Sequence, residues 1–153
     1  MGMIRMGRAA LVALAAATVA FLGDAALACE SDRAILDADF EGARMSACRA
    51  TRSGFAIAIE PENSPVNPSP WYAFRVTPKK PGTIKIVMRY SQAAHRYRPK
   101  RSEDAENWRL VDPGRVRVRN KGKRVALRLE MGTAPFFVAG QELLLTADYR
   151  AWI

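Results

Sequence analysis

Apolar and polar residues alternate in five short stretches of this chain. The clearest stretch is 83–90, where every second position is apolar: Ile84, Ile86, Met88 and Tyr90. The same period of two occurs in 54–60, 71–77, 115–119 and 123–131. Because successive side chains of a β-strand point to opposite faces, this alternation is typical of half-buried antiparallel strands. The pattern therefore predicts a strand in each of the five stretches.

Turn-forming sequences separate the expected strands. They are KKPGT at Lys79–Thr83, DPG at Asp112–Gly114 and NKGK at Asn120–Lys123. The last of these lies between two alternating stretches, so it predicts a β-hairpin. Several short strands with turns at this spacing predict an all-β fold, an antiparallel β-sandwich or, as an alternative, a small barrel.

The C-terminal segment 141–153 departs from the alternating pattern. Its small and apolar residues fall at helical spacing: Leu143, Leu144, Ala147 and Ala151, with Trp152 and Ile153 at the end. We predict that the sandwich occupies residues 29–140 and that a short helical tail follows it. Two roles stay open for the tail: it either folds back over a sheet or begins a linker to a further domain.

Residues 1–28 have the composition of a secretory signal peptide. Arg5 and Arg8 precede an apolar run at 9–22, and small residues follow at 26–28. This order of charged, apolar and small residues is typical of a cleaved leader, and the run is shorter than the roughly 20 residues of a membrane span. We therefore expect cleavage after Ala28, export to the periplasm or the medium, and no integral membrane span in the mature chain.

The two cysteines, Cys29 and Cys48, both lie after the expected cleavage site. In an oxidising compartment an even number of cysteines predicts a disulfide, here Cys29–Cys48. A lipidated Cys29 is the alternative, and it fits less well because Ala26 stands where a lipidation signal prefers a larger aliphatic residue. The two alternatives predict a soluble and a membrane-anchored protein, respectively.

The chain is basic, with a net charge of +9. For an exported domain, such a charge favours anionic envelope polymers, lipids or acidic proteins over nucleic acid as partners. The candidate anion-binding residues come from two segments: Arg96, Arg98, Lys100 and Arg101, then Arg115, Arg117 and Arg119. Arginine next to an aromatic ring such as Tyr97 can bind anionic groups. Two structural alternatives remain, because basic residues also keep a sheet surface soluble and protect an edge strand from pairing.

The residues needed for catalysis are sparse. A catalytic zinc site in a peptidase takes three protein ligands, commonly two histidines and a glutamate, and His95 is the single histidine. No serine lies in a G-x-S-x-G motif, and no phosphate-binding or calcium-binding loop occurs. The carboxylates Glu103, Asp104 and Glu106 form a polar cluster typical of a solvated loop. We therefore expect neither catalytic residues nor a cofactor.

Two motifs carry a resemblance to a known family. The first is SPVNPSPWYAFRV, which contains Asn67, Ser69, Pro70, Trp71, Tyr72, Ala73, Phe74, Arg75 and Val76. The second is HRYRPKRSEDAENW, which contains His95, Arg96, Tyr97, Pro99, Lys100, Ser102, Asp104 and Trp108. Together they resemble the N-terminal β-sandwich domain of bacterial zinc carboxypeptidases, in the branch related to cytosolic carboxypeptidases. The segment 39–45 (DFEGARM) also resembles the first strand of that domain.

The resemblance implies an accessory domain without catalytic machinery. In the family, a linker and a zinc-binding domain with an H-x-x-E motif follow the sandwich, and His95 does not match that motif. Ala105 departs from the family because a turn glycine is expected there. The implied functions are docking to a separately encoded carboxypeptidase domain, a truncated peptidase, or part of a zinc metallocarboxypeptidase. Binding of an anionic envelope polymer through basic residues is the alternative from a different class.

Overall fold

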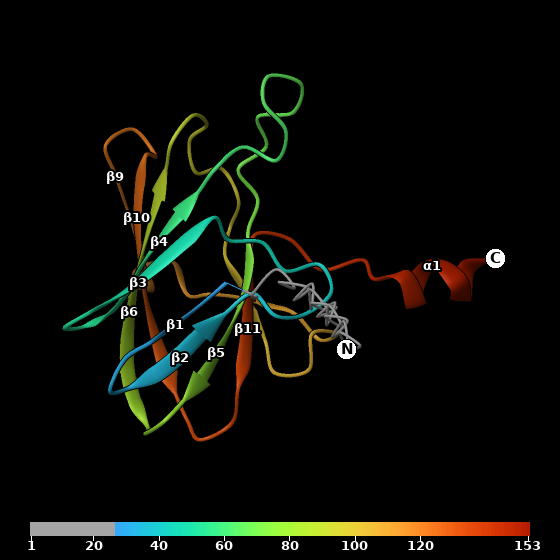
Figure 1. Cartoon of the computed structure of the whole chain (residues 1–153). Coiled ribbons are helices and arrows are strands. Elements are labelled where there is room, and N and C mark those ends of the chain that lie inside the picture. Colours follow the sequence, from blue (N-terminus) through green and yellow to red (C-terminus); the bar gives the residue numbers. More distant parts are fainter. Residues whose placement is uncertain (1–26) are drawn as a thin grey trace, which may run out of the picture.

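The computed structural model describes residues 27–153, which form two facing β-sheets and one short helix (Figure 1). The six-stranded sheet has the order β1 (Ala28–Glu30), β2 (Ala34–Asp37), β5 (Ala73–Pro78), β11 (Phe136–Ala139), β7 (Lys100–Ser102) and β8 (Arg109–Leu110). The five-stranded sheet has the order β3 (Ala47–Thr51), β4 (Gly54–Ile59), β6 (Gly82–Tyr90), β10 (Arg124–Met131) and β9 (Val116–Arg119). A 3-10 helix, η1 (Pro113–Arg115), precedes β9, and α1 (Thr146–Trp152) follows the last strand. The all-β sandwich prediction is confirmed.

The core lies between the two sheets and uses the alternating positions that the sequence shows. Ile86 of β6 is paired with Leu127 of β10, and both side chains are fully buried. From the other sheet, Phe74 and Phe136 are also fully buried. Burying one such side chain contributes about 1.5–3 kcal/mol, so the inward rows supply most of the stability. The outward positions of the same strands are thereby left free for other roles.

Strand pairing agrees with the hairpin prediction and differs at one point. β9 and β10 pair antiparallel, and Asn120, Lys121 and Gly122 of their loop have positive φ angles of 51°, 50° and 85°. β4 and β6, however, pair in parallel. The connection between them carries β5, which belongs to the opposite sheet. The chain therefore crosses the sandwich and re-enters the first sheet in the same direction.

The expectation of a strand at 39–45 is wrong. The amide of Ala43 donates to the carbonyl of Phe40 at 3.1 Å, and Gly42 has a φ of +77°, so this segment turns back on itself. Only Arg44 pairs with a strand residue, in an isolated bridge to Ala73. The segment lacks a period of two, so extending it as a strand would not bury an apolar face.

The predicted disulfide is confirmed: Cys29 and Cys48 are bonded, with a Cα–Cα distance of 6.0 Å. Cys29 lies in β1 and Cys48 in β3, which are edge strands of different sheets. The bond therefore closes one side of the sandwich, and it uses the sulfur atom that lipidation would need. The expected leader, apart from Leu27 and Ala28, lies outside the described residues.

The C-terminal tail does not cover either sheet. None of the residues of α1 is buried, and Trp152 is 70% exposed. Figure 1 shows α1 projecting away from the sandwich. Its first turn is tied to the 41–42 turn, because the amide of Thr146 donates to Glu41 Oε1 at 2.8 Å. Within residues 27–153, no helix has the length and apolar character needed to cross a membrane.

Candidate anion-binding site

The outward face of the five-stranded sheet carries a concentration of positive charge. We call it the basic face and define it by seven residues: Lys85, Arg89, Arg115, Arg117, Arg119, Arg124 and Arg128. They lie on β6, β10 and β9 or directly before β9. On β6 and β10 they alternate with buried core residues, and on β9 they alternate with the half-buried Val116 and the exposed Val118. The strand period of two therefore places all these cations on the same side of the sheet.

The strand register sets like charges directly opposite one another. Arg124 of β10 is the register partner of both Arg119 on β9 and Arg89 on β6. Neighbouring strands lie about 4.7–4.9 Å apart, so these three arginines form a row across the sheet. Four residues further along β10, Arg128 is the register partner of Lys85. Like charges in directly opposite positions destabilise a sheet, so this arrangement costs the fold stability.

Only one acidic group of the described residues compensates this charge through an ion pair. Glu130 accepts from Arg115 Nη1 at 2.6 Å and from Thr83 Oγ1 at 3.1 Å. The hydrogen bond from Arg115 lowers the pKa of Glu130 most, and the one from Thr83 lowers it further. Within residues 27–153, the remaining six cations of the basic face form no ion pair. The centre of the face is therefore uncompensated.

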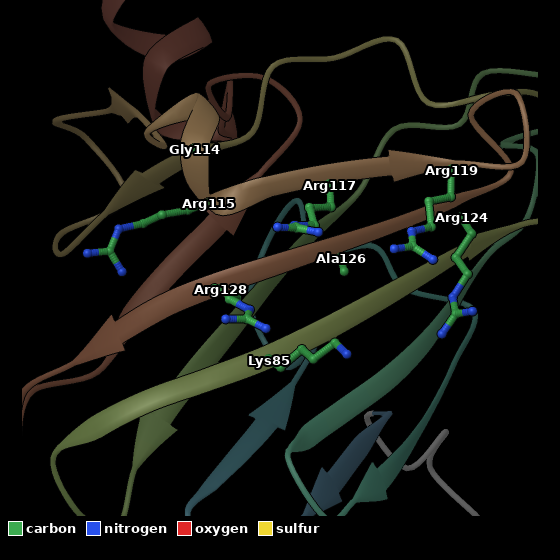
Figure 2. A pocket seen from close by; sticks show the side chains of 8 residues that line it. All are labelled: Lys85, Gly114, Arg115, Arg117, Arg119, Arg124, Ala126 and Arg128. Atoms are coloured by element: carbon green, nitrogen blue, oxygen red, sulfur yellow. The ribbon is translucent and has the colours of Figure 1, made fainter.

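Figure 2 shows six of the seven cations, all but Arg89, around a hollow of about 250 Å³. Arg117, Arg119 and Arg124 reach over the sheet beside Lys85 and Arg128, while Arg115 extends away from the group. The floor of the hollow includes the small side chain of Ala126, which lies opposite Arg117. Guanidinium groups around such a floor can donate several hydrogen bonds to one phosphate, sulfate or carboxylate group.

The sequence identified only part of this face. It pointed to Arg115, Arg117 and Arg119, and the structure adds Lys85, Arg89, Arg124 and Arg128. The added residues were visible as the polar positions of two alternating strands. Their convergence with β9 depends on the strand order and register, which alternation alone does not specify.

The second predicted basic segment lies elsewhere and has other contacts. Arg96 Nη2 donates to Tyr97 Oη at 2.9 Å, and its guanidinium lies 5.0 Å from the centre of the Tyr97 ring. Lys100, on β7 of the other sheet, forms an ion pair with Glu142. These two side chains are therefore engaged within the protein and lie apart from the basic face.

Arg101 has a structural environment as well. Its Nη1 donates to the carbonyl of Glu130 at 2.6 Å, and its guanidinium lies 3.9 Å from the centre of the Phe136 ring. Burial lowers the pKa of Arg101, and the nearby Glu103 acts in the opposite direction. Arg98 is exposed beside this segment. Arg101 thus connects the two sheets, whereas Arg96 and Arg98 keep exposed side chains.

The two motifs that carry the family resemblance meet in space. Ser69 Oγ lies 3.0 Å from Tyr97 Oη, which joins the proline-rich loop to the basic segment. Tyr90 Oη lies 2.9 Å from His95 Nδ1. Burial raises the pKa of Tyr90 and lowers that of His95, so both side chains are neutral near pH 7. His95 therefore anchors the segment and does not face the hollow.

The other signature residues form structural contacts too. Arg75 makes a two-pronged contact with the buried Asp37: Nη2 lies 3.0 Å from Oδ1, and Nε donates to Oδ2 at 3.1 Å. Trp108 Nε1 donates to the carbonyl of Ala105 at 2.9 Å. Tyr72 and Phe74 lie fully buried in the core, Pro70 is buried, and Trp71 is half-buried. Asn67 lies in the proline-rich loop, where its Nδ2 donates to Glu62 at 2.7 Å.

The expected turn position at Ala105 is present. Ala105 has a φ of +65°, a conformation that glycine adopts readily and other residues rarely adopt. Asp104 holds the loop, because its carboxylate accepts from the amides of Glu106 and Asn107 at 2.9 and 2.8 Å. Hydrogen bonds from Asn107, Ser102 and Glu106 lower the pKa of Asp104. The hydrogen bonds around Asp104 therefore stabilise this loop.

The donor set does not fit a catalytic zinc ion. His95 is the single histidine, and its Nδ1 is bonded to Tyr90. Both cysteines are joined in the disulfide. Within residues 27–153, no three histidine, cysteine or acidic side chains come together in a group that could hold a metal ion.

No protein-family model matches this sequence, and no curated protein matches it either. The fold, however, is similar to parts of solved metallo-carboxypeptidase structures. One is a metallo-carboxypeptidase from Burkholderia cenocepacia, with a TM-score of 0.60 and 12% identity over 78% of this chain and 31% of that chain. Another is a protein assigned as a carboxypeptidase A from Shewanella denitrificans, with a TM-score of 0.60 and 15% identity over 76% of this chain and 31% of that chain.

A third solved structure, a protein assigned as a carboxypeptidase from Burkholderia mallei, has a TM-score of 0.60 and 14% identity over 78% of this chain. The chain spans about a third of the length of these structures, 31% in each case. The comparison defines the fold as a β-sandwich of a kind found within metallo-carboxypeptidase structures.

Proposed function

We propose that this chain is an exported, non-catalytic binding module that holds an anionic polymer of the cell envelope on its basic face. The observation that carries the proposal is the row Arg119–Arg124–Arg89. These residues are in register on three adjacent strands, with no acidic residue between them. A row of like charges lowers the stability of the free protein, and a bound polyanion would remove that penalty.

A polymer fits this face better than a single ion does. Register partners are spaced about 4.7–4.9 Å apart across the strands, and alternate residues lie about 6.8 Å apart along a strand. A linear chain of phosphate, sulfate or carboxylate groups can contact several cations at once at such spacings. The face is open and polar, so we expect binding to weaken with salt.

A second candidate function is docking to a carboxypeptidase catalytic domain, as the resemblance implies. The likeness to parts of metallo-carboxypeptidase structures supports it, as does the exposed apolar surface of the tail, which includes Leu144, Tyr149 and Trp152. Size-exclusion chromatography of the chain and of its Leu144→Ser/Trp152→Ser variant tests the tail. An unchanged monomer in both cases would count against docking.

Retention on immobilised heparin and immobilised polyphosphate tests the proposed polyanion binding. The triple variant Arg89→Gln/Arg119→Gln/Arg124→Gln removes the row, and we expect it to elute at a clearly lower salt concentration than the unmodified chain. The matched control, Arg52→Gln/Lys80→Gln/Arg150→Gln, loses the same charge from exposed positions outside the basic face. Equal loss of retention in both variants would show that only net charge matters and would refute a defined site.

A further inference from the structure

The edge strand β9 offers a second kind of binding surface, which goes beyond the proposed polyanion site. β9 is the last strand of the five-stranded sheet, and its one strand partner among residues 27–153 is β10. An unpaired strand edge exposes backbone N–H and C=O groups that can pair with another extended chain. The two faces of β9 differ in chemistry, and this difference defines what the edge can accept.

The backbone of β9 shows which groups are free. The amide of Val116 donates to the carbonyl of Pro113 in η1, so it points away from β10. In an antiparallel strand, the N–H and C=O groups of alternate residues point to the same side. The N–H and C=O of Val118 therefore face the open edge, where an added strand could bond to them.

The inward side of β9 is apolar. Val118 is 52% exposed although its register partner Val125 is fully buried. A cavity of about 320 Å³ lies beside it. Val111, Pro113 and Val116 form an apolar wall of this cavity, and the segment 95–99, with Arg96 and Arg98, forms the rest of its lining. Val118 of the edge strand lines this cavity, so an apolar side chain of a strand added at this edge could enter it.

The outward side of β9 is basic. Arg117 and Arg119 alternate with Val116 and Val118, and they point to the basic face (Figure 2). A second copy of β9 would place arginine against arginine at this edge, which disfavours pairing of the protein with itself. An acidic strand would instead compensate the charge. The charge of this edge thus disfavours pairing with a second copy of β9 and favours an acidic strand.

We propose that β9 binds an extended peptide segment with alternating acidic and apolar residues by strand addition. The acidic side chains would lie against Arg117 and Arg119, and an apolar side chain would enter the cavity beside Val118. The backbone of the peptide would bond to Val118. Because β9 has four residues, a segment of about six residues covers the edge.

Two isomeric peptides test this inference with the full chain. One is a blocked hexapeptide of alternating Glu and Val residues, and the other has three Glu residues followed by three Val residues. Charge and composition are identical, so simple electrostatic attraction binds both equally. We expect the alternating peptide to bind at least tenfold more tightly at the same salt concentration, as measured by fluorescence anisotropy. Equal affinities would overturn the inference and leave the polyanion site untouched.

A pair of variants locates the site. Val118→Glu puts a negative charge at the cavity, and we expect it to weaken binding of the alternating peptide at least tenfold. Val66→Glu is the matched control, since Val66 is 81% exposed in the proline-rich loop. The same loss in both variants would overturn the inference, and so would a dimer of the unmodified chain that Val118→Glu disrupts.

Discussion

Arg124 on β10 lies directly opposite Arg119 on β9, an in-register pair of like charges on the open face of the sheet. Arg89 extends the pair into a row on the other side of Arg124. A sheet selected only for stability would place an opposite charge or an uncharged residue at the central position. The same row of charges therefore lowers the stability of the free protein and favours the binding of anions.

The first prediction follows from this link. Arg124→Gln removes the central charge and should stabilise the protein by about 0.5 kcal/mol at low salt. The gain should shrink as salt screens the repulsion, since the Debye length falls to about 3 Å at 1 M. Urea unfolding of both proteins at 20 mM and 1 M sodium chloride measures the effect. A variant less stable than the parent at low salt would contradict the account of the row.

The second prediction concerns the Cys29–Cys48 bond. It joins edge strands of the two sheets and spans 19 residues of sequence. The variant Cys29→Ser/Cys48→Ser should lose about 3 kcal/mol, because the unfolded chain gains the freedom that the closed loop denied it. Thermal unfolding without reductant measures the loss. Equal stability of parent and variant would show that the bond does not constrain the sandwich.

The third prediction concerns Ala105, which holds a φ of +65° in the loop that Asp104 organises. A left-handed conformation costs a residue with a side chain about 1–2 kcal/mol, and glycine avoids that cost. Glycine also gives the unfolded chain more freedom, so we expect Ala105→Gly to stabilise by about 0.5 kcal/mol. Ala105→Val is the control and should destabilise. If Ala105→Gly destabilised the protein, Ala105 would not have the left-handed backbone conformation described here.

The fourth prediction is a pH dependence that arises at His95. Burial lowers its pKa below the ordinary value of 6.5, so the folded state binds fewer protons than the unfolded state. The stability that neutral His95 provides is present above pH 6.5, and it is lost as the pH falls from there through the lower folded-state pKa. Protonation would also place a positive charge on the half-buried ring whose Nδ1 lies 2.9 Å from Tyr90 Oη.

Unfolding free energies of the parent and of His95→Gln between pH 7.5 and pH 5 test this. We expect the parent to lose more stability than the variant over this range. Identical pH profiles would mean that His95 does not titrate differently in the folded state.

Much of the fold could be predicted from the sequence because half-buried strands show their burial directly. Ile84 to Tyr90 and Val125 to Met131 alternate since one face of each strand meets the core. β11 gave no such signal, because Phe136, Val138 and Ala139 are all buried within a short central strand. A run without alternation does not distinguish a buried strand from other buried structure.

The site was partly visible for the same reason. The arginines of β9 stood out because they alternate within five residues, whereas the contribution of Arg124 depends on which strands become neighbours. The basic segment around Arg96 and Lys100 looked equally suited to anions. Arg96 contacts its sequence neighbour Tyr97, and Lys100 pairs with Glu142 from a segment distant in sequence, a pairing that composition does not reveal.

The most direct test of the central claim is an equilibrium titration of the full chain with soluble polyphosphate at several salt concentrations. The account predicts that log Kd rises with log salt for the parent. It also predicts that the Arg89→Gln/Arg119→Gln/Arg124→Gln variant binds at least tenfold more weakly and with a smaller salt slope, while the Arg52→Gln/Lys80→Gln/Arg150→Gln control stays within about twofold of the parent. Equal affinities and slopes for the two variants would contradict the claim that the basic face is a defined polyanion site.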